Sequence, residues 1–125
     1  MIPDQPGWWY PATVLDNVQP GSVAFNDEVF GPVVSLVRAK DETEAIALAN
    51  MSRFGLGAAI FSANRSRALA LASQQLQAGS IAINDFVKSD PRVPFGGCKD
   101  SGFGRELGKL GIHEFVNFKS IVMAG

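Results

Sequence analysis

Short apolar runs alternate with stretches of helical periodicity along the first two-thirds of the chain. Four apolar runs predict strands, at residues 8–15, 33–37, 58–63 and 80–84. The first run is aromatic and β-branched, and Pro11 places it at a sheet edge or a bulge because proline cannot donate to a β-ladder. Pro20 and Gly21, which follow it, suit the two central positions of a type II turn.

Two helices are predicted between the last three strands, at residues 42–51 and 65–77. Asp41 is the expected N-cap of the first helix, since its carboxylate can accept from a free amide of the first turn. Asn64 or Ser62 is expected to cap the second, and Gly79 to end it in a left-handed conformation. The order βαβαβ predicts the α/β class with an open, largely parallel sheet.

The chain changes character after Asn84. Residues 85–104 show no periodicity, and loops of that length in compact domains are usually functional or disordered. A short helix is predicted over residues 105–111 and a final strand over 115–123. Because a strand joins a parallel sheet only through a crossover, this last strand is expected to leave the sheet and pair elsewhere.

Composition and charge exclude several classes of function. The 125 residues are 46% hydrophobic and 18% charged, which is typical of one globular domain. A formal net charge of −1, with scattered basic residues, argues against a nucleic-acid partner. No apolar run approaches the roughly 20 residues of a membrane-spanning helix. We therefore expect no membrane partner, and a cytoplasmic location because the N-terminus lacks the pattern of a signal peptide. The 13 glycines and abrupt start indicate a piece of a larger protein.

The stretch VPFGGCKDSGFGRE, residues 93–106, contains the only cysteine, Cys98. A lysine neighbour such as Lys99 is a feature of activated cysteines, which favours a nucleophile. The only histidine is His113, and nothing in the spacing places it beside the thiol as a base. We therefore interpret Cys98 as a small apolar filler.

The glycines of this stretch match neither phosphate-binding pattern. The P-loop order is missing, and Gly102, Gly104 and Gly108 are one residue off the dinucleotide fingerprint. We interpret the glycines as positions of positive φ and of close backbone approach. One cysteine and one histidine cannot complete a zinc shell, so no metal site is expected.

Two interpretations of the acidic pair Asp27 and Glu28 remain open. The pair can be a solvated turn ahead of Gly31 and Pro32. A carboxylate beside an exposed aromatic such as Phe30 also suits a ligand with a sugar diol and a flat ring.

Several motifs occur together in the order of a known family. They are EVFGPV, FGLGAAIF, AGSIAIN and PFGGCKDSGFGRE, within a match from Pro11 to about Val122. In this combination the chain resembles the C-terminal portion of the aldehyde dehydrogenase superfamily. The resemblance implies NAD(P)-dependent oxidation of an aldehyde to a carboxylic acid: a cysteine thiolate attacks the carbonyl, hydride passes to nicotinamide, and a glutamate-activated water hydrolyses the thioester.

The resemblance assigns site residues by motif. It implies that Glu28 holds the nicotinamide-side ribose hydroxyls, that Phe30 packs by the nicotinamide, and that Phe95 lies at the substrate pocket. Asp27 stands where many members have a second glutamate. The family's nucleophile and base precede EVFGPV, so no catalytic residue is assigned here, and Cys98 does not inherit the nucleophile's role.

The resemblance also implies a division of the chain and a substrate. Residues 1–112 correspond to the end of the catalytic α/β domain, and residues 113–125 to the terminal strand of the oligomerisation domain, which implies a homo-oligomer. Within the family the chain is most similar to succinate-semialdehyde dehydrogenases, where a serine six residues before the PFGG phenylalanine contacts the remote carboxylate. Ser89 has that spacing, and Arg92 is a second candidate.

We therefore expect an NAD or NADP enzyme fragment that is inactive alone and acts on a small-molecule aldehyde. There are two alternatives to this interpretation: a non-catalytic assembly module, and a dehydrogenase fragment of different aldehyde specificity.

Overall fold

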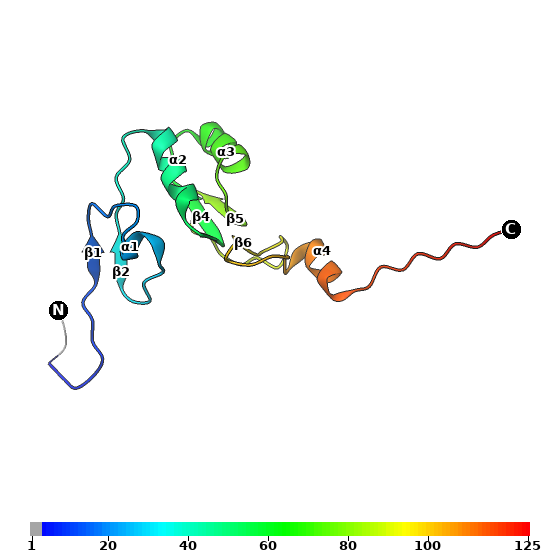
Figure 1. The fold of residues 1–125 in the computed structure, drawn as a ribbon, viewed down its shortest axis with the longest axis horizontal. Helices are drawn as coiled ribbons and strands as arrows, with labels where there is room; N and C mark the ends of the chain where they lie inside the picture. The colour runs from blue at the N-terminus through cyan, green and yellow to red at the C-terminus, as the bar shows by residue number, and fades with distance from the viewer. Residues whose placement is uncertain (1–3) are drawn as a thin grey trace. The chain divides into compact units, whose positions relative to one another are not determined.

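The computed structural model describes residues 4–125; the first residues of the N-terminus, for which no signal peptide is expected, lie outside the described residues. The chain divides into two compact units, Met1–Ser52 and Arg53–Gly125, which are described separately below. Figure 1 gives the course of the chain and the element labels.

The first unit is built on a parallel pair of short strands. Strand β1 (Thr13–Leu15) pairs with β2 (Val33–Ser35), and helix α1 (Val23–Asn26) lies between them in sequence (Figure 1). Helix α2 (Glu42–Met51) follows with the predicted bounds. The Asp41 side chain accepts from the Glu44 amide at 2.8 Å, which confirms the predicted cap.

In the first unit, the predicted turn at Pro20 and Gly21 is present, but the strand expected over residues 8–15 is shorter than predicted. The Pro20 and Gly21 turn is confirmed, because the Ser22 amide donates to the Gln19 carbonyl at 3.2 Å and Gly21 has φ +88°. The expected strand over residues 8–15 is wrong in length, since only its last three residues pair. Its partner β2 is equally short, and proline at Pro11 offers no amide to extend the ladder.

The second unit contains one complete parallel βαβ element. Strand β4 (Gly57–Ile60) leads through helix α3 (Arg65–Gln74) to β5 (Ser80–Ile83), which pairs with it in parallel over all four residues (Figure 1). The Asn64 side chain accepts from the Arg67 amide at 2.9 Å and is therefore the cap. Parallel pairs joined through helices place the chain in the α/β class, as predicted.

The end of α3 differs from the prediction. The helix ends at Gln74, three residues early, where the Gln75 and Leu76 amides both donate to the Leu71 carbonyl. Gly79 is not left-handed. It is a glycine for another reason: a Cβ there would lie 1.7 Å from the Gly96 carbonyl oxygen.

Two short strands of the second unit were not predicted by the sequence pattern. Strand β3 (Phe54–Gly55) pairs antiparallel with β6 (Cys98–Lys99), which lies inside the expected loop. Two-residue strands carry too little periodicity to be recognised in a sequence.

The C-terminal elements also differ from the prediction. Helix α4 (Gly108–Gly111) begins three residues later than expected, because Leu107 has φ +64° and Glu106 is paired as a bridge residue. The 3-10 helix η1 (Ile112–Phe115) continues directly from α4 and takes up Phe115, the first residue of the expected final strand. From Val116 onward the described chain forms no helix or strand, so the terminal strand stays a prediction.

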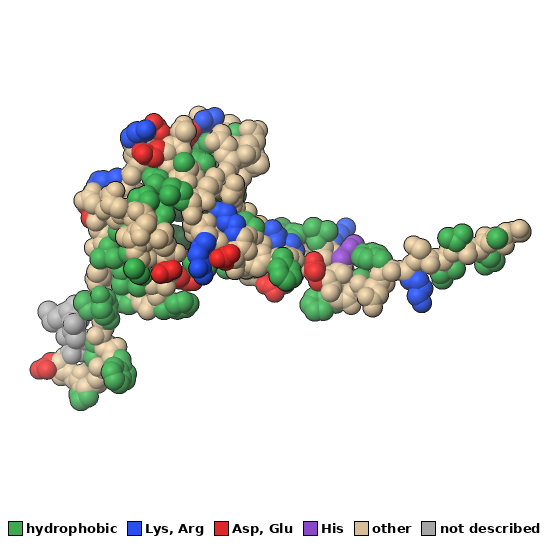
Figure 2. Space-filling model, viewed as in Figure 1, with side chains coloured by type: hydrophobic (Ala, Val, Ile, Leu, Met, Phe, Trp, Pro, Cys, Tyr) green, Lys and Arg blue, Asp and Glu red, His purple; other side chains and the backbone are tan. Residues whose placement is uncertain are grey.

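Few side chains form a closed core. Among the described residues, the buried hydrophobic side chains are Val18, Ala68 and Leu71. Large apolar side chains lie exposed instead, including Val14 and Val34, which are 64% and 58% exposed and directly opposite one another on β1 and β2. Hydrophobic side chains also follow the C-terminal segment (Figure 2). A parallel pair is normally covered on both faces, so these surfaces have the character of buried ones.

Within residues 4–125, no helix combines the length and the apolarity that crossing a membrane requires.

Candidate functional site

The candidate site is the loop between β5 and β6, which is fixed at its start by Asn84. The Asn84 amide donates to the Ile60 carbonyl at 2.9 Å. Its side chain accepts from the Ser62 amide at 2.7 Å and donates to the Ser62 carbonyl at 2.8 Å. These bonds tie together the carboxyl ends of β4 and β5, the edge where ligands bind in open parallel sheets.

The far end of the loop is fixed by a backbone bridge. Phe95 and Glu106 exchange two amide-to-carbonyl hydrogen bonds of 2.8 Å. The Arg105 guanidinium donates to the carbonyls of Gly97 and Gly104 at 2.7 and 2.6 Å. Phe95 is therefore held on a braced segment rather than on a free loop.

Glycines allow this segment to approach its neighbours closely. A Cβ at Gly97 would lie 2.6 Å from the Ser101 side chain, and one at Gly96 2.8 Å from the Gly104 carbonyl oxygen. Gly102 and Gly104 have φ of +119° and +78°. Both parts of the interpretation from sequence, positive φ and close approach, are confirmed for this stretch.

Cys98 lies in the β3–β6 pair and is half-buried. Its Sγ is 3.4 Å from the Gly55 carbonyl oxygen, and a Cβ at Gly55 would lie 2.5 Å from this sulfur. The side chain thus fills a position between two strands, which agrees with its interpretation as a filler.

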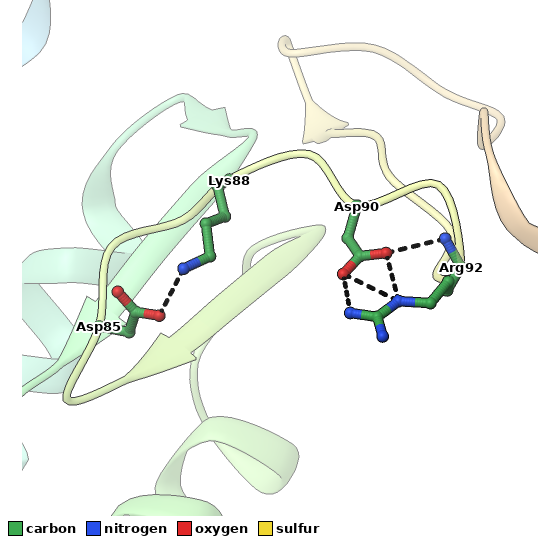
Figure 3. Close-up of polar contacts among 4 residues, drawn as sticks. All are labelled: Asp85, Lys88, Asp90 and Arg92. Carbon is green, nitrogen blue, oxygen red and sulfur yellow. Dashed lines mark hydrogen bonds and ion pairs between the residues drawn. The ribbon is translucent and has the colours of Figure 1, made fainter.

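Two ion pairs occupy the middle of the loop (Figure 3). The Lys88 ammonium donates to Asp85 at 2.9 Å, and this hydrogen bond lowers the pKa of the Asp85 carboxyl and raises the pKa of Lys88. The Arg92 guanidinium donates to Asp90, with the shortest bond at 2.6 Å, and lowers the pKa of Asp90 in the same way. Each cation of the loop therefore faces a carboxylate of the loop itself.

An open hollow of about 440 Å³ lies beside these pairs. Its walls come from β5 and the loop, and include Phe95, Asp90, Asp85 and Lys88. Of the three substrate-side candidates, Phe95 lines the hollow. Ser89 and Arg92 are exposed on the same loop, on either side of Asp90. The arrangement offers an apolar wall and nearby charged groups, as pockets for small polar ligands do.

The cofactor-side candidates Glu28 and Phe30 belong to the first unit, on the segment between α1 and β2. Both are exposed, Phe30 to 92%. An exposed carboxylate and an exposed aromatic ring on one short segment are chemically suited to a sugar diol and a flat ring, since the first accepts hydroxyl hydrogen bonds and the second packs a ring face. Within the described residues, no cluster of three histidine, cysteine, aspartate or glutamate side chains could hold a metal ion.

Sequence reasoning missed Asp85, Lys88 and Asp90 as members of this site. One local signal was present for Asp90, because aspartate followed by proline is typical of the first two positions of a type I turn. Such a turn brings the residue two positions later, Arg92, within hydrogen-bond reach of the aspartate side chain. Asp85 and Lys88 gave no such signal, because an acid and a base three residues apart occur on many solvated surfaces.

Comparison with known proteins gives one consistent family. The aldehyde dehydrogenase family model matches residues 2–121. The succinate semialdehyde dehydrogenase (NAD(P)+) Sad of Escherichia coli (strain K12) is 49% identical over 115 residues, which are 92% of this chain and 25% of that protein. A probable succinate-semialdehyde dehydrogenase (NADP(+)) of Synechocystis sp. is also 49% identical, over 97% of this chain and 26% of its own length.

Solved structures agree with the sequence relatives. The succinic semialdehyde dehydrogenase of Streptococcus pyogenes, in complex with NADP+, superposes with a TM-score of 0.83 at 39% identity, over 90% of this chain and 24% of that one. The chain thus spans about a quarter of the length of the relatives it matches. The match over nearly all of its residues shows that this chain belongs to the aldehyde dehydrogenase family.

Proposed function

We propose that this chain is the C-terminal part of an NAD(P)-dependent aldehyde dehydrogenase that oxidises succinate semialdehyde to the carboxylic acid through a thioester. The observation that carries the proposal is the 49% identity, over more than nine-tenths of the chain, to two bacterial succinate-semialdehyde dehydrogenases. The open hollow beside the braced loop at the carboxyl end of β5 supports the proposal, because ligands of open parallel sheets bind at that edge.

In this proposal the described residues bind and orient, and do not perform the covalent step. Glu28 would hold ribose hydroxyls and Phe30 would pack by the nicotinamide, which accepts a hydride when bound. Phe95 would form a wall of the aldehyde pocket. Ser89 and Arg92 would receive the remote carboxylate of the substrate, because a hydroxyl and a guanidinium both donate to carboxylate oxygens.

We further propose that the chain is inactive alone. It exposes 10033 Å² of surface. Two separate compact globules of about 5.5 and 7.8 kDa, the sizes of the two units, would together expose only about 7,800 Å² by the scaling of folded proteins. The excess of exposed surface is as large as the surface that a large permanent interface buries. It supports the proposal that the chain functions as part of a larger fold.

The finer architecture belongs to the same proposal. We propose that residues 1–112 contain the βαβαβ order of an open, largely parallel sheet when the rest of the fold is present. Residues 113–125 would add a strand to the sheet edge of a second subunit and make a homo-oligomer. The support is that apolar side chains in this segment lie uncovered, among them Phe118, Ile121 and Val122.

The same uncovered segment supports a second candidate, a non-catalytic assembly module. Light scattering on the 125-residue chain distinguishes it from a monomer. An oligomer that becomes monomeric after deletion of residues 115–125 would support the module, whereas a monomer unchanged by the deletion would exclude it.

The test of the first proposal compares the isolated chain with a hybrid enzyme, in which this chain replaces the matching quarter of the E. coli relative. The hybrid is expected to oxidise succinate semialdehyde with NAD+ or NADP+, and the isolated chain to show no turnover. Cys98→Ser should leave the activity of the hybrid intact. Turnover by the isolated chain that depends on Cys98 would contradict the proposal. A KM for succinate semialdehyde that Ser89→Ala does not change would favour a different aldehyde.

A further inference from the structure

Arg92 is held from one side by the carboxylate of Asp90 (Figure 3). Its Nε donates to Asp90 Oδ1 at 2.9 Å and to Oδ2 at 3.2 Å, and its Nη2 donates to Oδ2 at 2.6 Å. The aspartate thus occupies the Nε–Nη2 edge of the guanidinium. The Nη1 atom points away from Asp90 and makes no hydrogen bond within residues 4–125, so the Nη1–Nη2 edge stays open. Arginine can bind a second carboxylate through this edge.

The backbone fixes the distance between the two partners. The Val93 amide donates to the Asp90 carbonyl at 3.1 Å, which closes a turn with Pro91 at its second position. The Arg92 amide donates to Asp90 Oδ1 at 2.9 Å, and the Pro91 carbonyl accepts from the Gly108 amide at 3.1 Å. The turn is therefore tied to the start of α4, and the pair is preorganised by the chain around it.

The other cation of the loop is arranged differently. Lys88 is paired with Asp85 at 2.9 Å, and its ammonium is a point charge without the planar fork of a guanidinium. The two pairs leave the four charged side chains of the loop without net charge. An incoming carboxylate therefore finds its planar pair of hydrogen-bond donors in the loop at the open edge of Arg92.

We propose that Asp90 is a positioning residue that sets substrate specificity by holding Arg92 so that its Nη1–Nη2 edge receives the remote carboxylate of an ω-carboxy aldehyde. The proposal rests on the proposed function and deepens it. Asp90 lines the hollow together with Phe95, and Arg92, whose side chain is 85% exposed, is bonded to Asp90 at 2.6 Å, so the guanidinium lies next to a residue of the hollow's wall. In this proposal Asp90 acts on the remote carboxylate through Arg92 and makes no hydrogen bond of its own to it.

The test uses the hybrid enzyme with two aldehydes of the same chain length. Succinate semialdehyde carries the remote carboxylate and butanal does not. Asp90→Asn keeps the acceptor for the Arg92 amide, and hence the turn, but loses the charge that orients the guanidinium. Arg92→Lys keeps the charge but loses the fork. Asp16→Asn is the matched control, since it keeps the acceptor for the Asn17 amide but removes the charge from the pair with Arg38, which lies outside the loop.

Asp90→Asn is expected to raise KM for succinate semialdehyde about tenfold, with kcat within about twofold of the parent and KM for butanal unchanged. Arg92→Lys should give the same pattern. The double variant should be no worse than the more impaired single variant, because both substitutions remove one interaction. Asp16→Asn should leave both KM values unchanged.

Other outcomes overturn the inference. A lower KM for succinate semialdehyde in Asp90→Asn would show that Asp90 competes with the substrate instead of positioning Arg92. Equal effects on both aldehydes, or an equal effect of Asp16→Asn, would show a merely structural role. If the unmodified hybrid oxidises neither aldehyde, the proposed function itself fails, and this result is distinct from a hybrid that is active but insensitive to Asp90→Asn.

Discussion

The contact between Gly79 and Gly96 gives the sharpest prediction about stability. Gly79 immediately precedes β5, and Gly96 follows Phe95 in the braced segment of the site. A Cβ at Gly79 would lie 1.7 Å from the Gly96 carbonyl oxygen, 2.7 Å from its carbonyl carbon and 3.1 Å from the Gly97 Cα. All three are backbone atoms, so no side-chain rotation can relieve the clash.

Gly79→Ala must therefore displace the segment that carries Phe95. Overpacking of this kind costs about 1–3 kcal/mol, which corresponds to about 5- to 150-fold faster opening of the displaced segment. The amides of Phe95 and Glu106 report this directly, because they form the bridge that holds the segment. Hydrogen exchange of residues 93–108 in the hybrid enzyme should accelerate by that factor.

Gly31→Ala is the matched control, since a Cβ at Gly31 meets nothing within 4 Å. Exchange of residues 93–108 should not change in this variant. If Gly79→Ala exchanged as slowly as Gly31→Ala, the two segments would not approach as closely as the structure places them, and the explanation for this glycine would be refuted.

Three further predictions concern caps and charges. Arg105→Ala removes two charge-assisted hydrogen bonds and should lower the free energy of unfolding of the hybrid enzyme by about 2–3 kcal/mol, measured by urea denaturation. An unchanged free energy of unfolding would contradict the bracing role of Arg105. Asp41→Ala should lower the stability of α2 by about 1 kcal/mol, which would make hydrogen exchange of the Glu44 amide roughly fivefold faster. An unchanged exchange rate would contradict the cap. The Arg92 hydrogen bond lowers the pKa of Asp90 below its ordinary 3.8, so the pair should persist above that pH and be lost only as the pH falls through the lowered value. Carboxyl NMR titration should show this pKa returning toward 3.8 in Arg92→Gln, and an unmoved titration would refute the pairing.

The sequence predicted well where structure depends on neighbours within one turn. The Asp41 cap and the bounds of α2 follow from residues three and four positions apart, and the turn at Gly21 follows from a single dipeptide. The α/β class followed from the alternation of apolar runs with helices. Even here the end of α3 was placed three residues too late, because apolar spacing continued beyond the last helical hydrogen bond.

The candidate site was predicted in part, and by motif rather than by pattern. Glu28, Phe30, Ser89, Arg92 and Phe95 came from the family resemblance, and their roles remain predictions. The family itself is established by the match over nearly the whole chain.

By itself, the sequence determined the family, the α/β class and the local caps and turns, since these depend on residue identity and on short spacings. Only the tertiary structure decided which distant backbones meet: β3 with β6, Phe95 with Glu106, and Gly79 with Gly96. Such contacts join residues more than ten positions apart, and neither periodicity nor propensity carries information over that separation. The pairing of Asp90 with the Nε–Nη2 edge of Arg92 was likewise decided there, because the turn closed by the Val93 amide brings the two side chains together.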